Sequence, residues 1–249
     1  QFLNFIFTPM NYKLNISENA VGVAKSFAEA IYIKTKNKKS ENSFLNLAVS
    51  GGSTPRLLFE ILAAEYNETM PWETVRIFWV DERCVPPLHP ESNYGMTYDA
   101  LLSKIDIPAS NIFRMKGEEE PESEAIRYKN ILVNELSSVN NFPVFDLILL
   151  GMGDDGHTAS IFPNQMYLNT LSESVAVATH PLSGQKRITL TGNTIRNAHE
   201  VVFMITGENK AKILAEIIKQ KPMAKKYPAS YMYSINDVTI FYVDTTAAS

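Results

Sequence analysis

The feature that most constrains the fold is a nearly all-apolar run, Phe145–Leu150, that ends on a glycine-rich polar turn. A strand with one solvated face alternates apolar and polar residues, whereas a strand covered on both faces is apolar throughout. Other short apolar runs alternate along the chain with longer segments of helical period. This alternation predicts an α/β fold of the doubly wound, Rossmann-like type, with a mostly parallel open sheet and helices on both faces.

The predicted elements follow one another without an internal repeat or a low-complexity linker, so we expect a single domain over residues 1–249. Strands are expected at Phe44–Val49, Val75–Val80, Phe145–Leu150, Val175–Ala178, Arg187–Leu190, Val201–Ile205 and Thr239–Val243. Helices are expected at Val21–Ile33, after Pro55, and at Ser92–Leu102, Glu122–Leu136 and Asn209–Ile218.

Composition excludes several classes of protein. The net charge of -4, from 23 basic and 27 acidic residues, argues against a nucleic-acid partner. The single cysteine, Cys84, excludes an internal disulfide and fits a reducing, cytoplasmic compartment. Gln1–Met10 has no basic flank or long apolar core typical of a signal peptide, and no run reaches the ~18 apolar residues of a membrane span. The oligomeric state is left open.

The first polar turn, Ser50-Gly51-Gly52-Ser53-Thr54-Pro55, links a predicted strand to a predicted helix. Glycines allow backbone N–H groups to approach an anion closely, and the helix N-terminus adds partial positive charge. Ser53 or Thr54 is expected to cap the helix. The turn lacks the Gly-Lys-Ser/Thr of a Walker A loop and the last glycine of a nucleophile elbow. It therefore suits an anion, although a capped turn without a ligand would look similar.

The second turn, Asp81-Glu82-Arg83, follows the predicted strand Val75–Val80 and carries both signs of charge. The forked guanidinium of arginine suits a phosphate, a carboxylate or a developing oxyanion. Arg187 begins a later predicted strand and could complete a phosphate site, but taken alone an arginine there is better explained as a charge that protects a sheet edge. A surface ion-pair cluster is the alternative for the second turn.

The third turn, Gly151-Met152-Gly153-Asp154-Asp155-Gly156-His157, matches a dinucleotide-binding glycine pattern only superficially. Its variable positions are acidic, and Pro163 follows too soon for the helix that this motif requires. A rigid loop that presents Asp155 and His157 fits better, because a carboxylate can orient an imidazole and favour its uptake of a proton. We also find no ligand spacing typical of a catalytic metal, so neither a metal nor another cofactor is expected.

Together these turns resemble the 6-phosphogluconolactonase family, within the wider group that includes glucosamine-6-phosphate isomerase/deaminase. The most specific block is Gly-Asp-Gly-His-Thr-Ala-Ser, read here from Asp155-Gly156-His157 to Ser160, whereas the glycine turn is shared by the wider group. Further matching pieces are Trp79–Arg83 with Ser92-Asn93-Tyr94, Arg187–Thr191, Tyr227–Ser230 and Tyr242–Asp244. One departure, His180–Gln185, concerns only the shape of a loop.

The resemblance implies hydrolysis of a 6-phosphogluconolactone in the oxidative pentose phosphate pathway. It implies that His157 activates water with support from Asp155, and that Arg83 and Arg187 hold the phosphate or the carbonyl oxygen, in an order left open. The remaining substrate-binding candidates are Ser50, Gly51, Gly52, Ser53, Thr54, Asp81 and Gly153.

The main alternative is an isomerase/deaminase acting on glucosamine 6-phosphate. In the related deaminases a glutamate stands where this chain has Phe162, and a tyrosine stands where it has Arg83. Both differences favour hydrolysis. A non-enzymatic sugar-phosphate sensor is a further alternative, but the chain shows no helix-turn-helix segment or basic arm that would transmit a signal.

Overall fold

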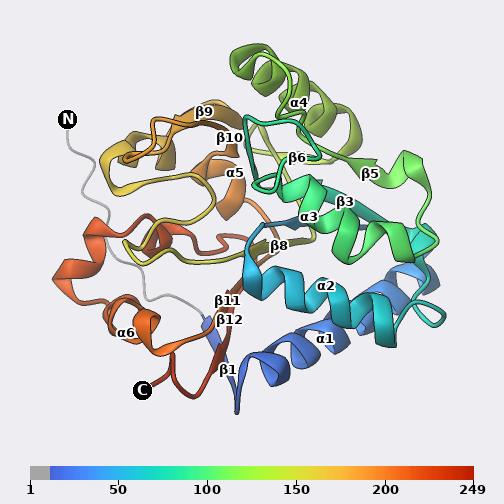
Figure 1. Ribbon diagram of the computed structural model, residues 1–249, viewed down its shortest axis with the longest axis horizontal. Coiled ribbons are helices and arrows are strands. Elements are labelled where there is room, and N and C mark those ends of the chain that lie inside the picture. The colour runs from blue at the N-terminus through green and yellow to red at the C-terminus, as the bar shows by residue number, and fades with distance from the viewer. Residues whose placement is uncertain (1–11) are drawn as a thin grey trace.

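The protein is described by a computed structural model that covers residues 12–249 (Figure 1). Its centre is a seven-stranded sheet in the order β1-β12-β11-β8-β2-β3-β5, and every neighbouring pair in it is parallel. The strands of this sheet are β1 (Tyr12–Ser17), β2 (Leu45–Val49), β3 (Val75–Trp79), β5 (Ile112–Phe113), β8 (Leu147–Leu150), β11 (Glu200–Ile205) and β12 (Val238–Asp244). The predicted α/β class and parallel sheet are confirmed.

Helices connect these strands and cover the sheet on both sides (Figure 1). Helix α1 packs on α2, and α2 packs on α3, whereas α4 packs on β9 and β10. The helices are α1 (Ala20–Ser40), α2 (Ser53–Glu65), α3 (Asn93–Ala100), α4 (Pro121–Glu135), α5 (Gly192–Arg196) and α6 (Ala211–Ile218). Short 3₁₀ segments add η1 (Trp72–Thr74), η2 (Leu102–Lys104), η3 (Ala109–Asn111), η4 (Pro163–Asn169), η5 (Glu208–Lys210), η6 (Pro222–Lys226) and η7 (Pro228–Tyr231).

Side-chain caps fix the start of two helices that frame the sheet. The Asn19 side chain accepts a hydrogen bond from the Gly22 amide at α1, and the Ser92 hydroxyl accepts one from the Gly95 amide at α3. Each bond satisfies a backbone donor that would otherwise lack a partner in the first turn. Helix α1 runs longer than the predicted Val21–Ile33, to Ser40.

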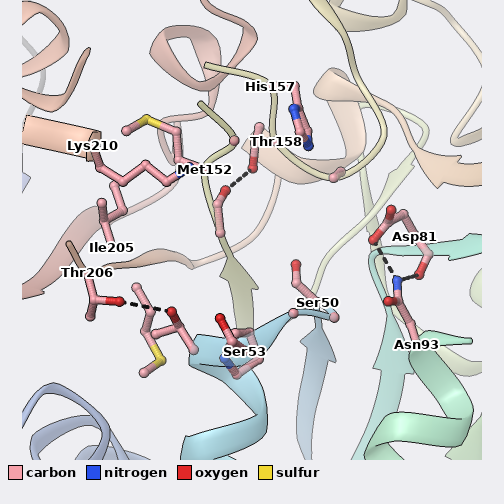
Figure 2. Close-up of a pocket in the computed structure, with 18 of the residues that line it drawn as sticks. Ser50, Ser53, Asp81, Asn93, Met152, His157, Thr158, Ile205, Thr206 and Lys210 are labelled. Atoms are coloured by element: carbon pink, nitrogen blue, oxygen red, sulfur yellow. Dashed lines mark hydrogen bonds between the residues drawn. The ribbon is translucent and has the colours of Figure 1, made fainter. Parts of the chain in front are cut away.

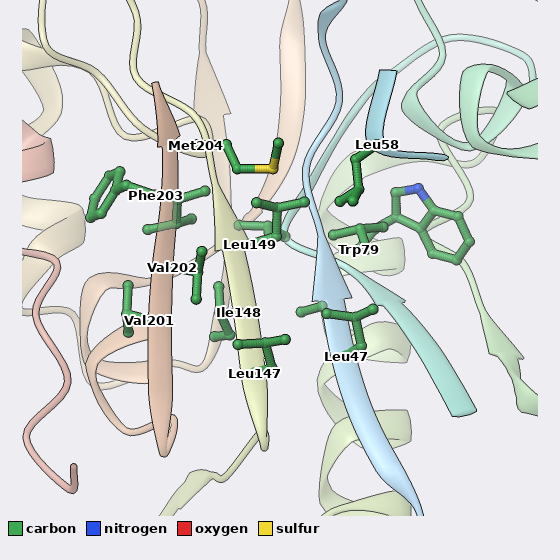
Figure 3. Packing of buried hydrophobic residues seen from close by; sticks show 14 of the residues in the cluster. Leu47, Leu58, Trp79, Leu147, Ile148, Leu149, Val201, Val202, Phe203 and Met204 are labelled. Carbon is green, nitrogen blue, oxygen red and sulfur yellow. The ribbon is translucent and has the colours of Figure 1, made fainter. Parts of the chain in front are cut away.

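The core lies on the middle strands of the sheet. All four side chains of β8 are buried, as the uninterrupted apolar run predicts for a strand covered on both faces. Figure 3 shows Leu147, Ile148 and Leu149 of β8 between side chains of β2 and β11. Burial of large apolar side chains of this kind stabilises the fold by roughly 1.5–3 kcal/mol each.

One expectation needs correction. The predicted strands near Val175 and Arg187 do not join the central sheet but form a separate antiparallel sheet in the order β4-β10-β9. Its strands are β4 (Asp81–Arg83), β10 (Lys186–Leu190) and β9 (Val175–Thr179); a two-stranded ribbon of β6 (Ser138–Val139) and β7 (Phe142–Pro143) lies elsewhere. Asp81–Arg83, predicted as a turn, is therefore a short strand, because its backbone pairs with β10 while its side chains remain polar.

The three polar segments nevertheless converge. Strands β8, β2 and β3 are neighbours in the sheet, and they end on Leu150, Val49 and Trp79. In open parallel sheets this carboxyl edge is where ligands bind. Within residues 12–249 no helix is long and apolar enough to cross a membrane. The expectation for Gln1–Met10 lies outside the described residues.

Candidate active site

A cavity of about 460 Å³ opens at the carboxyl edge of β2, β3, β8 and β11 (Figure 2). It is lined by Ser50, Gly51, Gly52, Ser53, Thr54, Pro55, Asp81, Arg83, Asn93, Gly151, Met152, Gly153, His157, Thr158, Ala159, Arg187, Met204, Ile205, Thr206, Asn209 and Lys210. Of the predicted site residues, all but Asp155 line this cavity, and Asp155 contacts it through His157. The size is typical of a small-molecule site.

The turn between β2 and α2 approaches its neighbours closely. A Cβ atom on Gly51 would lie 1.7 Å from Asn93 Oδ1, so a side chain larger than hydrogen does not fit there. Gly52 has φ of +111° and is the N-cap of α2, a conformation that favours glycine. The expected cap by Ser53 or Thr54 is wrong, because the helix begins at Ser53 and no side chain caps it.

The first residues of α2 therefore line the cavity, and no described side chain accepts from their backbone amides at the N-cap. The Ser50 hydroxyl donates instead to the Leu149 carbonyl oxygen at 2.8 Å, which holds the end of β2 to β8. The Thr54 and Thr206 hydroxyls lie 3.1 Å apart and join α2 to the end of β11. The arrangement at this end of the cavity suits an anion.

Asp81 connects the other two segments. One carboxylate oxygen accepts from the Asn93 amide at 3.1 Å, and the other accepts from the Ser160 hydroxyl at 2.6 Å. Asn93 also donates to the Asp81 carbonyl oxygen at 2.9 Å. Figure 2 shows Asp81 and Asn93 together on one side of the cavity. Because Asn93 packs on Gly51 and Ser160 follows His157 by three residues, this carboxylate ties all three polar segments together.

Glu82, the next residue of β4, accepts hydrogen bonds from backbone amides at the start of α3. Burial raises the pKa of its carboxyl, although backbone amides of Tyr94, Asn93 and Arg83 oppose that shift. Glu82 thus anchors the start of α3 and does not line the cavity.

Arg83 and Arg187 line the cavity from adjacent strands. They are paired directly in the register of β4 and β10, and the buried Nε atom of each has no hydrogen-bond partner in the described part of the chain. Burial, and then the neighbouring charge of Arg83, lowers the pKa of Arg187. Two guanidinium groups held side by side favour the binding of an anion between or beside them.

The third turn fixes an imidazole at the cavity wall. His157 Nδ1 lies 2.5 Å from Asp155 Oδ1, which also accepts from the His157 backbone amide at 3.0 Å. Burial raises the pKa of Asp155, but the hydrogen bonds from His157 outweigh it and lower the pKa to about 2. The carboxylate is therefore ionised at neutral pH, and it leaves Nε2 as the nitrogen that can take up a proton.

Glycines shape this loop around the imidazole. A Cβ on Gly153 would lie 2.1 Å from His157 Nδ1, and Gly156 has φ of +77° with its Cα against the Tyr227 ring. The Thr158 hydroxyl donates to the Gly151 carbonyl oxygen at 2.7 Å and closes the loop. The Phe162 ring lies 4.9 Å from the His157 ring, and no helix begins between Gly151 and Phe162. The rejection of the dinucleotide motif agrees with this backbone.

Sequence reasoning missed the fourth strand end. Thr206, Asn209 and Lys210 follow β11 and line the cavity opposite Asp81, as Figure 2 shows for Thr206 and Lys210. A signal was present, because a predicted strand ended just before Thr206-Gly207 and a lysine followed. Lys210 forms an ion pair with Asp154. Among residues 12–249 no group of three or more His, Cys, Asp or Glu side chains is arranged to hold a metal ion.

Comparison with known proteins agrees with this architecture. The profile of the family Glucosamine-6-phosphate isomerases/6-phosphogluconolactonase matches residues 18–241. The chain is 43% identical to the 6-phosphogluconolactonase of Treponema pallidum over 82% of its length and 83% of that protein. It is 46% identical to the enzyme of that name from Haemophilus influenzae, over 83% of this chain and 87% of that one.

A solved structure described as that of devB protein superposes with a TM-score of 0.90 at 38% identity, covering 95% of this chain and 98% of the other. The segment that the family profile matches, residues 18–241, includes the cavity and all three polar turns. The chain belongs to the glucosamine-6-phosphate isomerase/6-phosphogluconolactonase family.

Proposed function

We propose that this protein is a 6-phosphogluconolactonase that hydrolyses 6-phosphoglucono-1,5-lactone to 6-phosphogluconate. The observation that carries the proposal is the placement of an ionised Asp155, an imidazole and the guanidinium groups of Arg83 and Arg187 around one cavity. Ester hydrolysis needs an activated water, relief of charge on the carbonyl oxygen and a grip on the substrate. The cavity supplies a group for each of these needs.

In the proposed mechanism His157 Nε2 removes a proton from a water molecule as the water oxygen attacks the lactone carbonyl carbon. Asp155 keeps the other ring nitrogen as the donor and stabilises the imidazolium that forms. The tetrahedral intermediate then expels the ring oxygen, which takes the proton back from His157. General base catalysis of this kind contributes roughly 10²–10⁴-fold.

Two parts of the cavity could bind the 6-phosphate: the glycine turn with its backbone amides, and the wall that carries the arginine side chains. We assign it to the Gly51-Gly52-Ser53 turn, with Thr54 assisting and Arg187 and Lys210 supplying positive charge. Arg83 then faces the carbonyl end of the lactone. Ser50, Asp81 and Gly153 complete the walls that contact the sugar ring.

A glucosamine-6-phosphate isomerase/deaminase is the competing function within this family. It shuttles protons between carbon atoms and benefits from an additional acid near the imidazole. Here an apolar ring, Phe162, is packed against His157, and it is only 1% exposed. This environment favours simple water activation over a second proton transfer.

The experiment is a parallel assay of the purified protein with freshly prepared 6-phosphoglucono-1,5-lactone and with glucosamine 6-phosphate. We expect acid release from the lactone well above its spontaneous opening, and no ammonia or fructose 6-phosphate from the amino sugar. Turnover of the amino sugar without lactone hydrolysis would reverse the assignment. Binding of both without turnover would indicate a sensor.

A further inference from the structure

Two consecutive aspartates in the third turn have different partners. Asp155 accepts from His157, whereas Asp154 points the other way and accepts from the first residues after β11. Asn209 Nδ2 donates to Asp154 Oδ1 at 2.7 Å, and Lys210 Nζ donates to the same oxygen. The mechanism assigns no task to Asp154, although it adjoins the residue that holds the base.

The Lys210 side chain is the better buried member of this ion pair. It is 15% exposed and lines the cavity, whereas the Asp154 side chain is 73% exposed. The hydrogen bond from Lys210, followed by its charge, lowers the pKa of Asp154 and keeps this carboxylate ionised. An ammonium group has three donors, so one bond to Asp154 leaves two for another acceptor.

The backbone segment that carries Lys210 is held by contacts with β12 and with the glycine turn. The Gly207 amide donates to both carboxylate oxygens of Asp244 at 3.1 Å each, at the end of β12. Thr206 contacts Thr54 of the glycine turn. The backbone of this segment is therefore fixed beside the anion end of the cavity, while the long side chain of Lys210 would be free to rotate without Asp154.

We propose that Asp154 is a positioning residue for substrate binding: it holds the Lys210 ammonium at the cavity wall, oriented toward the 6-phosphate. The inference rests on the proposed function and assigns separate tasks to the tandem aspartates. Asp155 acts through His157 on the chemical step, and Asp154 acts through Lys210 on the phosphate. A lysine that is ordered in advance loses less conformational entropy when the ligand binds.

The third turn, which carries His157, is held by hydrogen bonds that do not involve Asp154. The roles of Asp154 and Asp155 can therefore be separated by mutation. The Gly153 amide donates to the His157 carbonyl oxygen at 2.8 Å, and the Ala229 amide donates to the Gly156 carbonyl oxygen at 3.0 Å. Loss of Asp154 removes neither bond. Its effect should therefore appear in the KM for the phosphorylated lactone and leave kcat unchanged.

The test compares Asp154→Ala with Asp154→Asn, because the asparagine oxygen still accepts from Lys210 while the charge is gone. We expect Asp154→Ala to raise the KM for 6-phosphoglucono-1,5-lactone by roughly three- to tenfold, the range set by ordering one lysine side chain. Asp154→Asn should stay within about twofold of the wild type, since a neutral acceptor keeps most of the geometry. Both variants should hydrolyse unphosphorylated gluconolactone at wild-type rates.

A competing interpretation predicts that the KM for the phosphorylated lactone falls in both variants. If Asp154 merely neutralises Lys210 and competes with the phosphate, both variants should bind the phosphorylated lactone more tightly. That result, an unchanged KM in Asp154→Ala, or an equal loss on both lactones would overturn the proposal. In a Lys210→Gln background, Asp154→Ala should have no further effect, because the two residues act as one unit.

Calorimetric titration of the protein with inorganic phosphate separates this inference from the proposed function. Asp154→Ala should weaken phosphate binding relative to Asp154→Asn even if the wild type hydrolyses neither lactone. Asp154→Ser serves as a second short side chain should Asp154→Ala fail to fold. Equal phosphate affinity in the alanine, serine and asparagine variants would contradict the positioning role.

Discussion

Arg83 and Arg187 are directly paired across the antiparallel strands β4 and β10, and the buried Nε of each guanidinium has no hydrogen-bond partner within residues 12–249. A buried Nε–H group without an acceptor is unfavourable, and the lowered pKa of Arg187 reflects first its burial and then the charge of Arg83. Such an arrangement is typical of a site that receives its counter-charge from a ligand.

Arg187→Ala should therefore weaken binding of the phosphorylated lactone far more than that of unphosphorylated gluconolactone. A charge-assisted hydrogen bond contributes about 1.5–3 kcal/mol, which corresponds to at least tenfold in KM. Steady-state kinetics on both lactones measure the difference. Equal losses on the two substrates would refute the assignment of Arg187 to the phosphate.

Gly51→Ala tests the packing that joins the glycine turn to Asn93. The new Cβ would lie 1.7 Å from Asn93 Oδ1, so the turn, α3 or both must move. We expect a loss of about 1–3 kcal/mol in the free energy of unfolding, as for other overpacked sites, together with reduced turnover because Asn93 holds Asp81. Denaturant unfolding and kinetics measure the two effects.

Gly151→Ala is the matched control, since nothing lies within 4 Å of a Cβ built there. It should change the free energy of unfolding little. Comparable damage from both substitutions would show that the close approach of Asn93 is not what restricts position 51.

The prediction of the fold from the sequence was strongest where hydrophobic pattern and local chemistry agreed. The apolar run that ends at Leu150 and the glycines after Val49 located β8, β2 and the turns behind them. The second sheet could not be foreseen, because Asp81–Arg83 has the composition of a turn and is a strand only through pairing with β10, about a hundred residues later. The same is true of β1, which pairs in parallel with β12 at the other end of the chain.

Within the site, contacts inside one short loop could be predicted from the sequence, whereas contacts between distant strands could not. His157 and Asp155 are two residues apart, so their contact was predictable from a short loop, whereas the pairing of Arg83 with Arg187 required the sheet register. Lys210 was overlooked because it lies five residues after the predicted strand ends at Ile205, and only the folded chain brings it to the cavity. Asn93 was noticed only as part of the family resemblance, since its partners Asp81 and Gly51 lie on other elements.

The pH dependence of stability should carry the signature of Asp155. Its pKa of about 2 in the folded protein lies below the ~3.9 of an exposed aspartate, so the carboxylate stabilises the fold above about pH 4. That contribution should disappear as the pH falls from about 4 to 2. Thermal unfolding of the wild type and of Asp155→Asn over this range should show Tm values that converge in acid; a constant difference in Tm would contradict the ion pair with His157.

Removal of metals should leave hydrolysis intact, because the proposed mechanism assigns every step to side chains and backbone amides of this chain. Prolonged treatment with EDTA followed by gel filtration should not change kcat by more than the error of the assay. Activity that is lost on this treatment and restored by added zinc would reveal a metal site that the mechanism omits.

The most direct test of the whole account is the turnover of His157→Asn on 6-phosphoglucono-1,5-lactone, corrected for spontaneous opening of the lactone. Asparagine keeps a polar side chain of similar size but cannot act as a general base near neutral pH. We expect a folded variant with nearly normal KM and a kcat lowered by roughly 10²-fold or more, while Asp155→Asn loses less. A folded His157→Asn variant with near-normal corrected turnover would contradict the central claim and would point to another base, such as Asp81.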